Sequence, residues 1–464
     1  MLKLLVSLVL LAPAAARADE PLRINFEGRT YSVGAPSAAL PAMDKAFFSL
    51  PGAKAAKKKW TVMVFVNGKN DLESAGLLNL NMMELVGSNK DVSIVAEIGR
   101  MKGQAQGDTA DDGDWTGSRR IYVQKDDDME KIKSPAVMTT PTVDMGDYKR
   151  AVDFVKWSKK NYPAEKYLLI LWDHGSGWMD PRKEAKAAAS NDKGISFDDE
   201  TGNYIRTREI GSIVREAGGV DVLAFDACLM QMGEVLSEVK GSAQVMVGSE
   251  ETISGVGYPY HIFLSAMAKE PGMSAEKLGT ILVEAYKMFY ETTIKKGAQL
   301  SAVRVAKANE FETRVKEVAA AARAANDVPA LKAARAGVMR FDMIGVASDP
   351  QKQISFYGDL YNYLQLMENA MTAATPAAAD FKAKSAALRQ FIVKDLVIYN
   401  RYYDKDRTGR SFADTHGISV YIPPVIEAID QAKLEGIFEG KYQDFVFARN
   451  TGWHDFVTFL YGAK

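Results

Sequence analysis

The strongest constraint on the fold of this chain is a recurrence of short, unbroken apolar runs separated by stretches of helical character. Apolar runs of this length, without polar alternation, fit strands of a parallel sheet that is covered on both faces. Strands that alternate with helices indicate βαβ units. The runs are residues 60–66, 92–98, 167–172, 220–225 and 243–247, with a further strand, which could be antiparallel, at 119–124. We therefore expect an α/β fold with a mostly parallel sheet flanked by helices.

The stretches between these runs predict the covering helices. Residues 148–160 are amphipathic, residues 207–217 follow a candidate N-cap at Thr207, and residues 229–239 follow the run at 220–225.

The character of the sequence changes after residue 270. Residues 275–294, 309–325 and much of 353–400 are rich in Ala, Leu and Lys and predict helices, while 300–305 and 417–422 look like strands. We expect four parts: a signal peptide at 1–18, an N-terminal extension at 19–59 that could be a propeptide, a main α/β domain at 60–270, and a helix-rich region at 271–464 whose strands could complete the sheet.

The first eighteen residues have the three parts of a secretory signal. Lys3 supplies a positive charge, residues 4–11 are apolar, and Ala16-Arg17-Ala18 forms a small-x-small cleavage site before Asp19. The apolar run is too short to span a bilayer, and no later segment approaches 18 apolar residues. We expect an exported protein, secreted or periplasmic, without a transmembrane segment.

Composition excludes some classes of function. The 58 basic and 59 acidic side chains give a formal net charge of −1, and the single cysteine rules out zinc-finger spacing. Nucleic acid is therefore not an expected partner. That cysteine, Cys228, has no partner for an intrachain disulfide, so in an oxidising compartment it is either a buried, inert thiol or one kept for its chemistry.

Reactive residue types stand where three of the apolar runs end. His174-Gly175 follows the run at 167–172, Asp226-Ala227-Cys228 follows the run at 220–225, and Glu250 and Glu251 follow the run at 243–247. Ligands of open α/β sheets bind at the carboxyl ends of the strands. His174 and Cys228 are 54 positions apart (228 − 174), which one helical crossover and a loop would fill, so their strands could be neighbours.

A thiol beside an imidazole can attack an amide. The thiolate of Cys228 would add to the carbonyl carbon, the imidazolium of His174 would protonate the leaving amine, and the backbone N–H groups of Gly175 and Cys228 could form the oxyanion hole. A helix beginning directly after Cys228 would favour the thiolate. Alternatively, Cys228 is a small core residue and His174 caps a carbonyl group.

The His-Gly and Asp-Ala-Cys blocks, each after an apolar strand, resemble the caspase-like cysteine peptidases, which include caspases, legumains and gingipains. Within that group the chain is similar to the clostripain family. The supporting segments are Asn70-Asp71-Leu72-Glu73 within 60–73, Gly117-Ser118-Arg119-Arg120, residues 169–178, residues 221–234, Ser249-Glu250-Glu251-Thr252 with Gly257-Tyr258-Pro259-Tyr260, and residues 417–423. The resemblance implies a caspase-like fold, a catalytic domain at 60–270, a His174–Cys228 dyad, and cleavage after Arg or Lys of protein or peptide substrates.

The acid two residues before the cysteine gives this specificity a physical basis. Asp226 and Cys228 would point to the same side of an extended strand, so a buried Asp226 carboxylate could pair with a basic substrate side chain. Asp226 could instead orient a loop through backbone N–H groups. Glu250 and Glu251 are further candidates for the same pocket.

The resemblance also implies self-processing between His174 and Cys228. The stretch between them contains four basic residues where a cut could fall, Arg182, Lys183, Lys186 and Lys193. The same stretch could instead be an ordinary solvated loop.

The chemistry requires no cofactor. Calcium is implied only by the resemblance, because the acidic clusters at 108–114 and 198–200 do not match an EF-hand loop. We interpret these clusters as surface turns and predict no metal ligands. His261, His416 and His454 are interpreted as structural. The sequence does not predict the oligomeric state, and the alternative function is a catalytically silent, caspase-like binding or scaffold protein.

Overall fold

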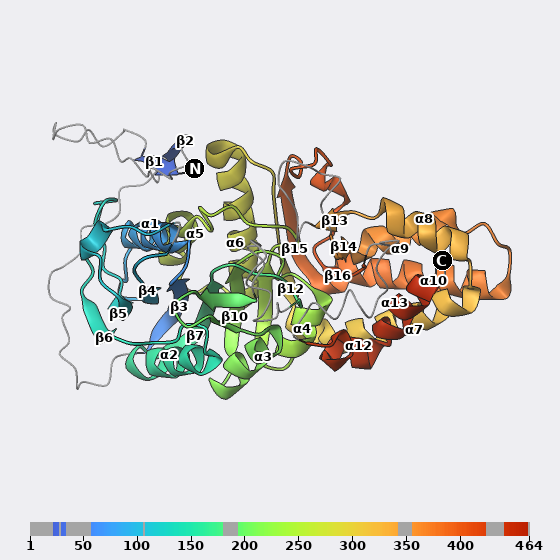
Figure 1. Cartoon of the computed structure of the whole chain (residues 1–464), viewed down its shortest axis with the longest axis horizontal. Helices are drawn as coiled ribbons and strands as arrows, with labels where there is room; N and C mark the ends of the chain where they lie inside the picture. The colour runs from blue at the N-terminus through green and yellow to red at the C-terminus, as the bar shows by residue number, and fades with distance from the viewer. Residues whose placement is uncertain are drawn as a thin grey trace.

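The computed structural model describes residues 57–104, 107–179, 194–341, 355–423 and 440–462, and the backbone of residues 22–26 and 29–33. Its centre is a nine-stranded sheet with the strand order β15-β12-β11-β10-β7-β3-β4-β5-β6 (Figure 1). The parallel strands are β3 (Lys58–Gly68), β4 (Val92–Arg100), β7 (Ala164–Trp172), β10 (Val220–Asp226) and β11 (Ala243–Gly248). The predicted mostly parallel α/β sheet is confirmed.

Antiparallel strands complete the sheet at both edges. On one side lie β5 (Gly117–Tyr122) and β6 (Ala136–Thr140), and on the other lie β12 (Ala298–Arg304) and β15 (Val397–Tyr403). The strand expected at 119–124 is thus antiparallel, and the region after residue 270 supplies two strands of the sheet. The strand expected at 417–422 is β16 (Ser419–Tyr421), which belongs to a separate three-stranded sheet with β13 (Arg340–Phe341) and β14 (Tyr357–Asp359).

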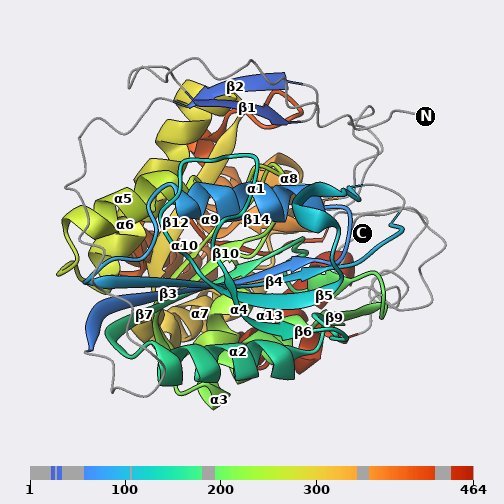
Figure 2. The ribbon, with the colours of Figure 1, turned by 90° about the vertical axis from the view of Figure 1, so that its left-hand side faces the viewer.

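Helices cover both faces of the large sheet, as Figure 2 shows. One face packs against α1 (Glu73–Glu84), α5 (Tyr260–Lys269) and α6 (Ala275–Phe289). The other packs against α2 (Tyr148–Asn161), α3 (Thr207–Glu216), α4 (Gly233–Val239) and α7 (Ala308–Ala325). Every residue of β4 is buried, which explains why the central strands are continuous apolar runs.

The remaining helices form a region beside the β15 edge, at the right of Figure 1. They are α8 (Val328–Gly337), α9 (Leu360–Ala370), α10 (Pro376–Phe391), α12 (Val446–Thr451) and α13 (Trp453–Gly462). Their apolar side chains join the core cluster on the α7 face of the sheet. The helix-rich region is therefore packed continuously against the sheet.

Two predicted helix starts are wrong. The N-cap of α3 is Arg206, with Thr207 as the first helical residue. The helix expected from residue 229 begins at Gly233, because Leu229 has a left-handed φ of 65° that a helix cannot include.

The predicted N-terminal extension contains a backbone hairpin formed by β1 (Leu22–Phe26) and β2 (Arg29–Val33), which pair antiparallel. Within the described part of the chain, no helix combines the length and apolarity needed to cross a membrane.

A buried lysine ties a second hairpin to the end of β3. The hairpin is formed by β8 (Ile195–Asp198) and β9 (Asn203–Ile205). Lys69 Nζ, fully buried, lies 3.0 Å from Asp198 Oδ2 and 2.5 Å from Glu200 Oε2, and it donates to the carbonyl oxygen of Val143 at 2.6 Å. The expectation that the acidic cluster at 198–200 is a surface turn is wrong for Asp198, which is fully buried.

Replacing this lysine should destabilise the protein strongly. Lys69→Met leaves the buried Asp198 carboxylate without its cation, a loss of about 3–5 kcal/mol in the free energy of unfolding. Lys59→Met is the matched control, because the ion pair of Lys59 with Glu165 is exposed, with side-chain exposures of 45% and 43%. Urea denaturation should show a change below about 1 kcal/mol for the control. Equal effects of the two substitutions would contradict the buried pair.

Candidate active site

The pairing of β7 with β10 sets the position of the candidate dyad. The two strands run parallel with Trp172 opposite Asp226, and the N–H of Asp173 donates to the carbonyl oxygen of Asp226 at 3.3 Å. His174 and Cys228 each stand two residues beyond this last pair, so they leave neighbouring strands at the same level. The structure therefore brings together the two residues that the sequence singled out.

Gly175 allows the two strand ends to approach closely. A Cβ atom at this position would lie 2.3 Å from the carbonyl oxygen and 3.0 Å from the nitrogen of Cys228. These distances leave no room for a side chain, so the His174-Gly175 backbone lies directly against Cys228. The side chain of His174 is 15% exposed and Cys228 is partly buried, so neither is sealed inside the core.

A carboxylate from the end of β3 holds the imidazole. His174 Nε2 lies 2.7 Å from Asp71 Oδ1. Because β3 pairs with β7 on the side opposite β10, Asp71 reaches His174 from the far side of the dyad. The carboxylate fixes the orientation of the ring and stabilises its protonated form.

Sequence reasoning did not assign Asp71 to the site, although the signal was present. Asp71 follows the apolar run at 60–66 in the same way that His174 and Cys228 follow theirs. The rule that polar residues at the carboxyl ends of parallel strands converge would have included it.

The sulfur of Cys228 is bound by the loop after β11. The N–H of Ile253 lies 3.2 Å from Cys228 Sγ, and the thiol in turn donates to the carbonyl oxygen of Ile253 at 3.7 Å. A backbone donor at this position stabilises a thiolate. The expected helix dipole does not have this role, because α4 begins five residues after Cys228, at Gly233.

Asp226 is buried beneath the loop before α5. Its Oδ2 accepts hydrogen bonds from the N–H of Tyr258 and the hydroxyl of Tyr260, both at 3.0 Å. Burial raises the pKa of the Asp226 carboxyl to about 7, against which these two donors act. These contacts are those expected if Asp226 orients the loop. Its position two residues before Cys228 is the one expected for a specificity pocket.

The two glutamates after β11 occupy different environments. Glu250 is fully buried, and its Oε2 accepts from the N–H of Gly417 at 2.9 Å and from Gln299 Nε2 at 3.0 Å. These partners stand on β12 and just before β16, so the Glu250 carboxyl is directed toward the C-terminal region. The Oε1 of Glu251 accepts from the N–H of Thr252 at 2.7 Å, within the same loop.

Another buried acid supports the turn that carries the imidazole. Asp173 Oδ1 accepts from Asn70 Nδ2 at 2.7 Å, and its Oδ2 accepts from the N–H of Phe197 at 2.5 Å. Burial raises the pKa of Asp173 to about 7, although the neighbouring His174 acts in the opposite direction. Asp173 thus joins the end of β7 to the end of β3 and to β8.

The four predicted cut sites, Arg182, Lys183, Lys186 and Lys193, lie outside the described residues. Both flanks of that stretch are well anchored. Before it, the N–H of Met179 bonds the hydroxyl of Tyr357 at 3.3 Å, and Trp178 packs on the rings of Tyr421, Tyr442 and Phe445. After it comes β8, which is bonded to Lys69, Asn70 and Asp173.

Several carboxyl groups of the acidic clusters already have other partners. Lys69 Nζ already neutralises Asp198 and Glu200, and Asp112 Oδ1 accepts from the N–H of Ile132 at 2.9 Å. In the ranges that the structure describes, no group of three or more His, Cys, Asp or Glu side chains is arranged to hold a metal ion. No step of the chemistry is therefore assigned to calcium.

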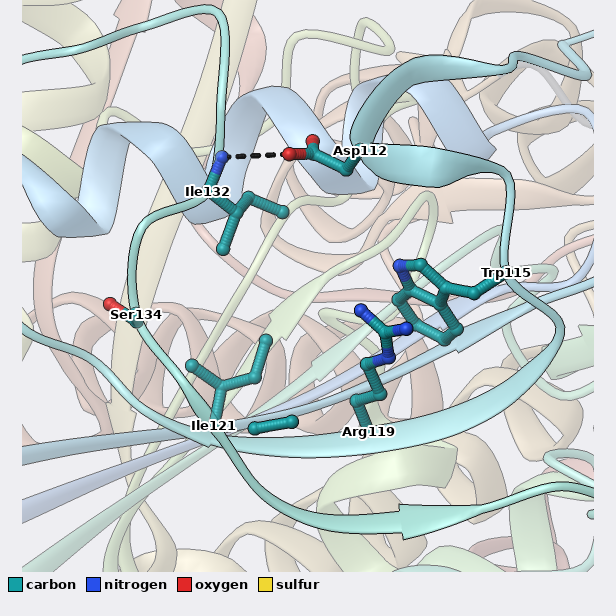
Figure 3. A pocket seen from close by; sticks show the side chains of 7 residues that line it. Asp112, Trp115, Arg119, Ile121, Ile132 and Ser134 are labelled. Carbon is teal, nitrogen blue, oxygen red and sulfur yellow. Dashed lines mark hydrogen bonds between the residues drawn. The ribbon is translucent and has the colours of Figure 1, made fainter.

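A small hollow beside β5 does not include the dyad. Figure 3 shows Trp115, Arg119, Ile121 and Ile132 on its walls, with the Arg119 guanidinium 4.2 Å from the centre of the Trp115 ring. Three strands of the sheet separate β5 from β10.

A thiol and an imidazole at adjacent strand ends of a mostly parallel α/β sheet are the arrangement of caspase-like cysteine peptidases. The family model described as the clostripain family matches residues 64–458. The chain belongs to the clostripain family of cysteine peptidases.

Comparisons with individual proteins agree with this assignment. Clostripain of Hathewaya histolytica is 28% identical over 221 residues, which are 45% of this chain and 42% of that protein, so the match spans less than half of the relative. A secreted C11 cysteine protease from Bacteroides thetaiotaomicron, bound to an irreversible peptide inhibitor, has a TM-score of 0.58 at 17% identity and covers 85% of this chain and 99% of its own. An inactive zymogen C11 protease from Parabacteroides distasonis has a TM-score of 0.61 at 17% identity with the same coverage. These two similarities support the fold.

A methyl group on Gly175 should disturb the site. Gly175→Ala forces the Cys228 backbone to shift, at a cost of about 1–3 kcal/mol in the free energy of unfolding, and the alkylation rate of Cys228 should change with it. Gly272→Ala is the control, since a Cβ there would meet nothing within 4 Å. Thermal unfolding and iodoacetamide labelling measure the two effects. A Gly175→Ala protein with the thermal stability and labelling rate of the wild type would contradict the close approach of Gly175 to the Cys228 backbone.

Proposed function

We propose that the chain is an exported cysteine endopeptidase that cuts peptide bonds after Arg or Lys. The observation that carries this proposal is the meeting of Cys228, His174 and Asp71 at the ends of three adjacent parallel strands. The clostripain family membership supports the reaction class.

The mechanism follows from the contacts of each residue. Cys228 attacks the scissile carbonyl carbon as a thiolate, which the N–H of Ile253 stabilises. His174 then protonates the leaving amine and removes a proton from the water that hydrolyses the acyl-enzyme. Asp71, bonded to His174 Nε2, acts as a positioning residue, so Nδ1 is the nitrogen that exchanges protons with the reactants.

Two backbone N–H groups form the proposed oxyanion hole. Gly175 and Cys228 lie in van der Waals contact through their main chains. Donors held this rigidly need no reorganisation as negative charge develops on the carbonyl oxygen.

We assign specificity to a negative charge beside the nucleophile. Asp226 precedes Cys228 by two residues and lies under the 257–260 loop, with Glu251 on the adjacent loop. A buried carboxylate that pairs with a guanidinium or ammonium group would favour basic substrates.

Export and self-processing are parts of the same proposal. The signal-like features of residues 1–18 support export, as does the fold shared with a secreted protease. The basic residues between 180 and 193, the anchored flanks and the likeness to a zymogen structure support a cut between His174 and Cys228.

A peptide panel tests the proposal. Purified protein is incubated with fluorogenic peptides that end in Arg, Lys, Asp or Asn, beside a Cys228→Ala preparation. We expect turnover after Arg and Lys only, loss of turnover in Cys228→Ala, and a Cys228→Ala chain that remains in one piece. Absence of turnover would favour a silent binding protein, and preference for Asp or Asn would contradict the basic pocket.

The raised pKa of Asp226 predicts a pH-dependent specificity. A carboxyl with a pKa of about 7 is neutral below that pH and charged above it, so its attraction for a basic side chain grows as the pH rises through 7. The ratio of kcat/KM for an Arg peptide to that for its neutral citrulline analogue should rise roughly tenfold from about pH 6 to about pH 8.

In Asp226→Asn this ratio should be low and independent of pH. Titration of Cys228 and His174 affects both peptides equally and cancels in the ratio. If the substitution lowers both rates by the same factor and preserves the ratio, Asp226 orients only the loop.

A further inference from the structure

Two buried carboxyl groups lie together behind the loop that binds the Cys228 sulfur. Glu250 follows β11 and Asp359 ends β14, and both are fully buried. Consecutive N–H groups bind them: that of Gly417 donates to Glu250 Oε2 at 2.9 Å, and that of His416 donates to Asp359 Oδ2 at 2.5 Å. These consecutive donors hold two fully buried carboxyl groups close together, and both cannot carry a full negative charge there.

The hydrogen bonds show where a shared proton lies. Both oxygens of Asp359 accept from nitrogen, Oδ2 from His416 and Oδ1 from the N–H of Asn362 at 2.6 Å. Glu250 Oε2 accepts from Gly417 and Gln299, but Oε1 has no donor among the described residues. Glu250 Oε1 is thus the one oxygen of the two carboxyl groups without a nitrogen donor, and it is where a proton held by the pair would sit.

Glu250 lies within the segment that holds the nucleophile. The N–H of Leu229 donates to the carbonyl oxygen of Glu251 at 3.2 Å, and that of Gln231 donates to Ser249 at 3.0 Å. Two residues beyond Glu251, the N–H of Ile253 meets Cys228 Sγ. Residues 249–253 are therefore tied by hydrogen bonds to the segment that carries Cys228.

The partner residues come from the C-terminal region. Asp359 leads into α9, and Gly417 precedes β16, where the N–H of Ser419 donates to the carbonyl oxygen of Gln231 at 3.0 Å. The carboxyl pair thus connects this region to the Cys228 loop.

We propose that Glu250 acts as a protonated acid that shares its proton with Asp359, and that this pair positions the 249–253 loop so that the Ile253 N–H stabilises the Cys228 thiolate. Glu250 is assigned as a positioning residue, since it would act on the thiolate through the Ile253 N–H. The inference deepens the proposed peptidase function, on which its catalytic significance rests.

Other titratable groups near the pair come from several elements. Glu251 adds negative charge beside Glu250. His416 Nδ1 lies 3.3 Å from Asp359 Oδ1 and 3.0 Å from the carbonyl oxygen of Asp414, and its ring stacks on Tyr361 at 3.8 Å. The guanidinium of Arg389 lies 5.0 Å from the centre of the same Tyr361 ring.

These neighbours set the direction of the pH dependence. Burial and the adjacent Asp359 raise the pKa of Glu250 well above its ordinary value. Burial lowers the pKa of His416, but Asp359 and Asp414 outweigh it, so that pKa is also raised. A group with a raised folded-state pKa contributes stability at low pH and loses it as the pH rises through that pKa. Ordering of the loop should therefore weaken on the alkaline side.

The experiment measures iodoacetamide alkylation of Cys228 in the full chain across pH, a readout that does not require peptidase activity. Glu250→Gln places an amide N–H₂ where the proton lies and keeps an acceptor for Gly417, so it mimics the protonated acid. Glu250→Ala removes the link. Asp359→Asn replaces one of two required acceptors by a donor. Glu84→Gln is the matched control, because Glu84 is a fully buried carboxyl with a raised pKa that bonds Lys133 and Ser134 in a different part of the fold.

We expect Cys228 of the Glu250→Gln protein to be alkylated at a rate within about twofold of wild type at low pH. As the pH rises it should react faster than wild type, because the amide at position 250 cannot ionise and the loop keeps its position. Glu250→Ala and Asp359→Asn should alkylate about tenfold more slowly near neutral pH, equivalent to about one unit in the pKa of the thiol. Glu84→Gln should change the melting temperature but not the alkylation rate.

Three results would overturn the proposal: a Glu250→Gln protein as slow as Glu250→Ala, an Asp359→Asn protein that behaves like Glu250→Gln, or a wild-type to Glu250→Gln ratio that is constant with pH. If the Glu250→Ala protein does not fold, the alkylation rates of Glu250→Gln and Asp359→Asn still test the proposal, because they are expected to differ. Normal alkylation behaviour with no peptide turnover would reject the peptidase function alone.

Discussion

The parallel pairing of β7 with β10 is the constraint on which the site depends. Because Trp172 lies opposite Asp226, each strand ends at the same level, and the residues two positions further on become neighbours. A shift of the register by one residue would turn the side chains of one strand to the other face of the sheet. The register is fixed by side chains buried on both faces, among them Leu169 and Leu223 on one and Ile170 and Ala224 on the other. The packing of the core therefore determines where the candidate imidazole and thiol are placed.

Much of this arrangement could be predicted from the sequence because it is local. Unbroken apolar runs identified the central strands, and polar residues at their ends identified His174 and Cys228. The chain direction at Cys228 could not be predicted in this way, because the left-handed Leu229 interrupts a segment whose composition favours a helix. Asp71 was missed although it follows the same rule. The partners of Glu250 could not be predicted from the sequence, because Asp359 and Gly417 stand far along the chain and approach Glu250 only through tertiary packing.

Buried carboxyl groups with backbone donors recur around the candidate site, three at strand ends of the large sheet and one, Asp359, at the end of β14 in the three-stranded sheet. Asp173 receives the N–H of Phe197, Asp226 that of Tyr258, Glu250 that of Gly417, and Asp359 that of His416. Loops leave backbone N–H groups without the partners that helices and sheets provide, and a carboxyl group at a strand end satisfies them. The loops around the site are thereby fixed to the rigid sheet, as preorganised catalysis requires.

The anchoring on both sides of residues 180–193 has a consequence for how the molecule holds together. Trp178 is packed among the rings of the C-terminal region, while Asp198 and the rest of β8 are bonded to the end of β3. Neither attachment uses the intervening peptide bonds. Severing the backbone there would release no element from the folded body, so two polypeptides could behave as one particle until a denaturant separates them. The folded structure therefore does not depend on an unbroken backbone between Trp178 and β8.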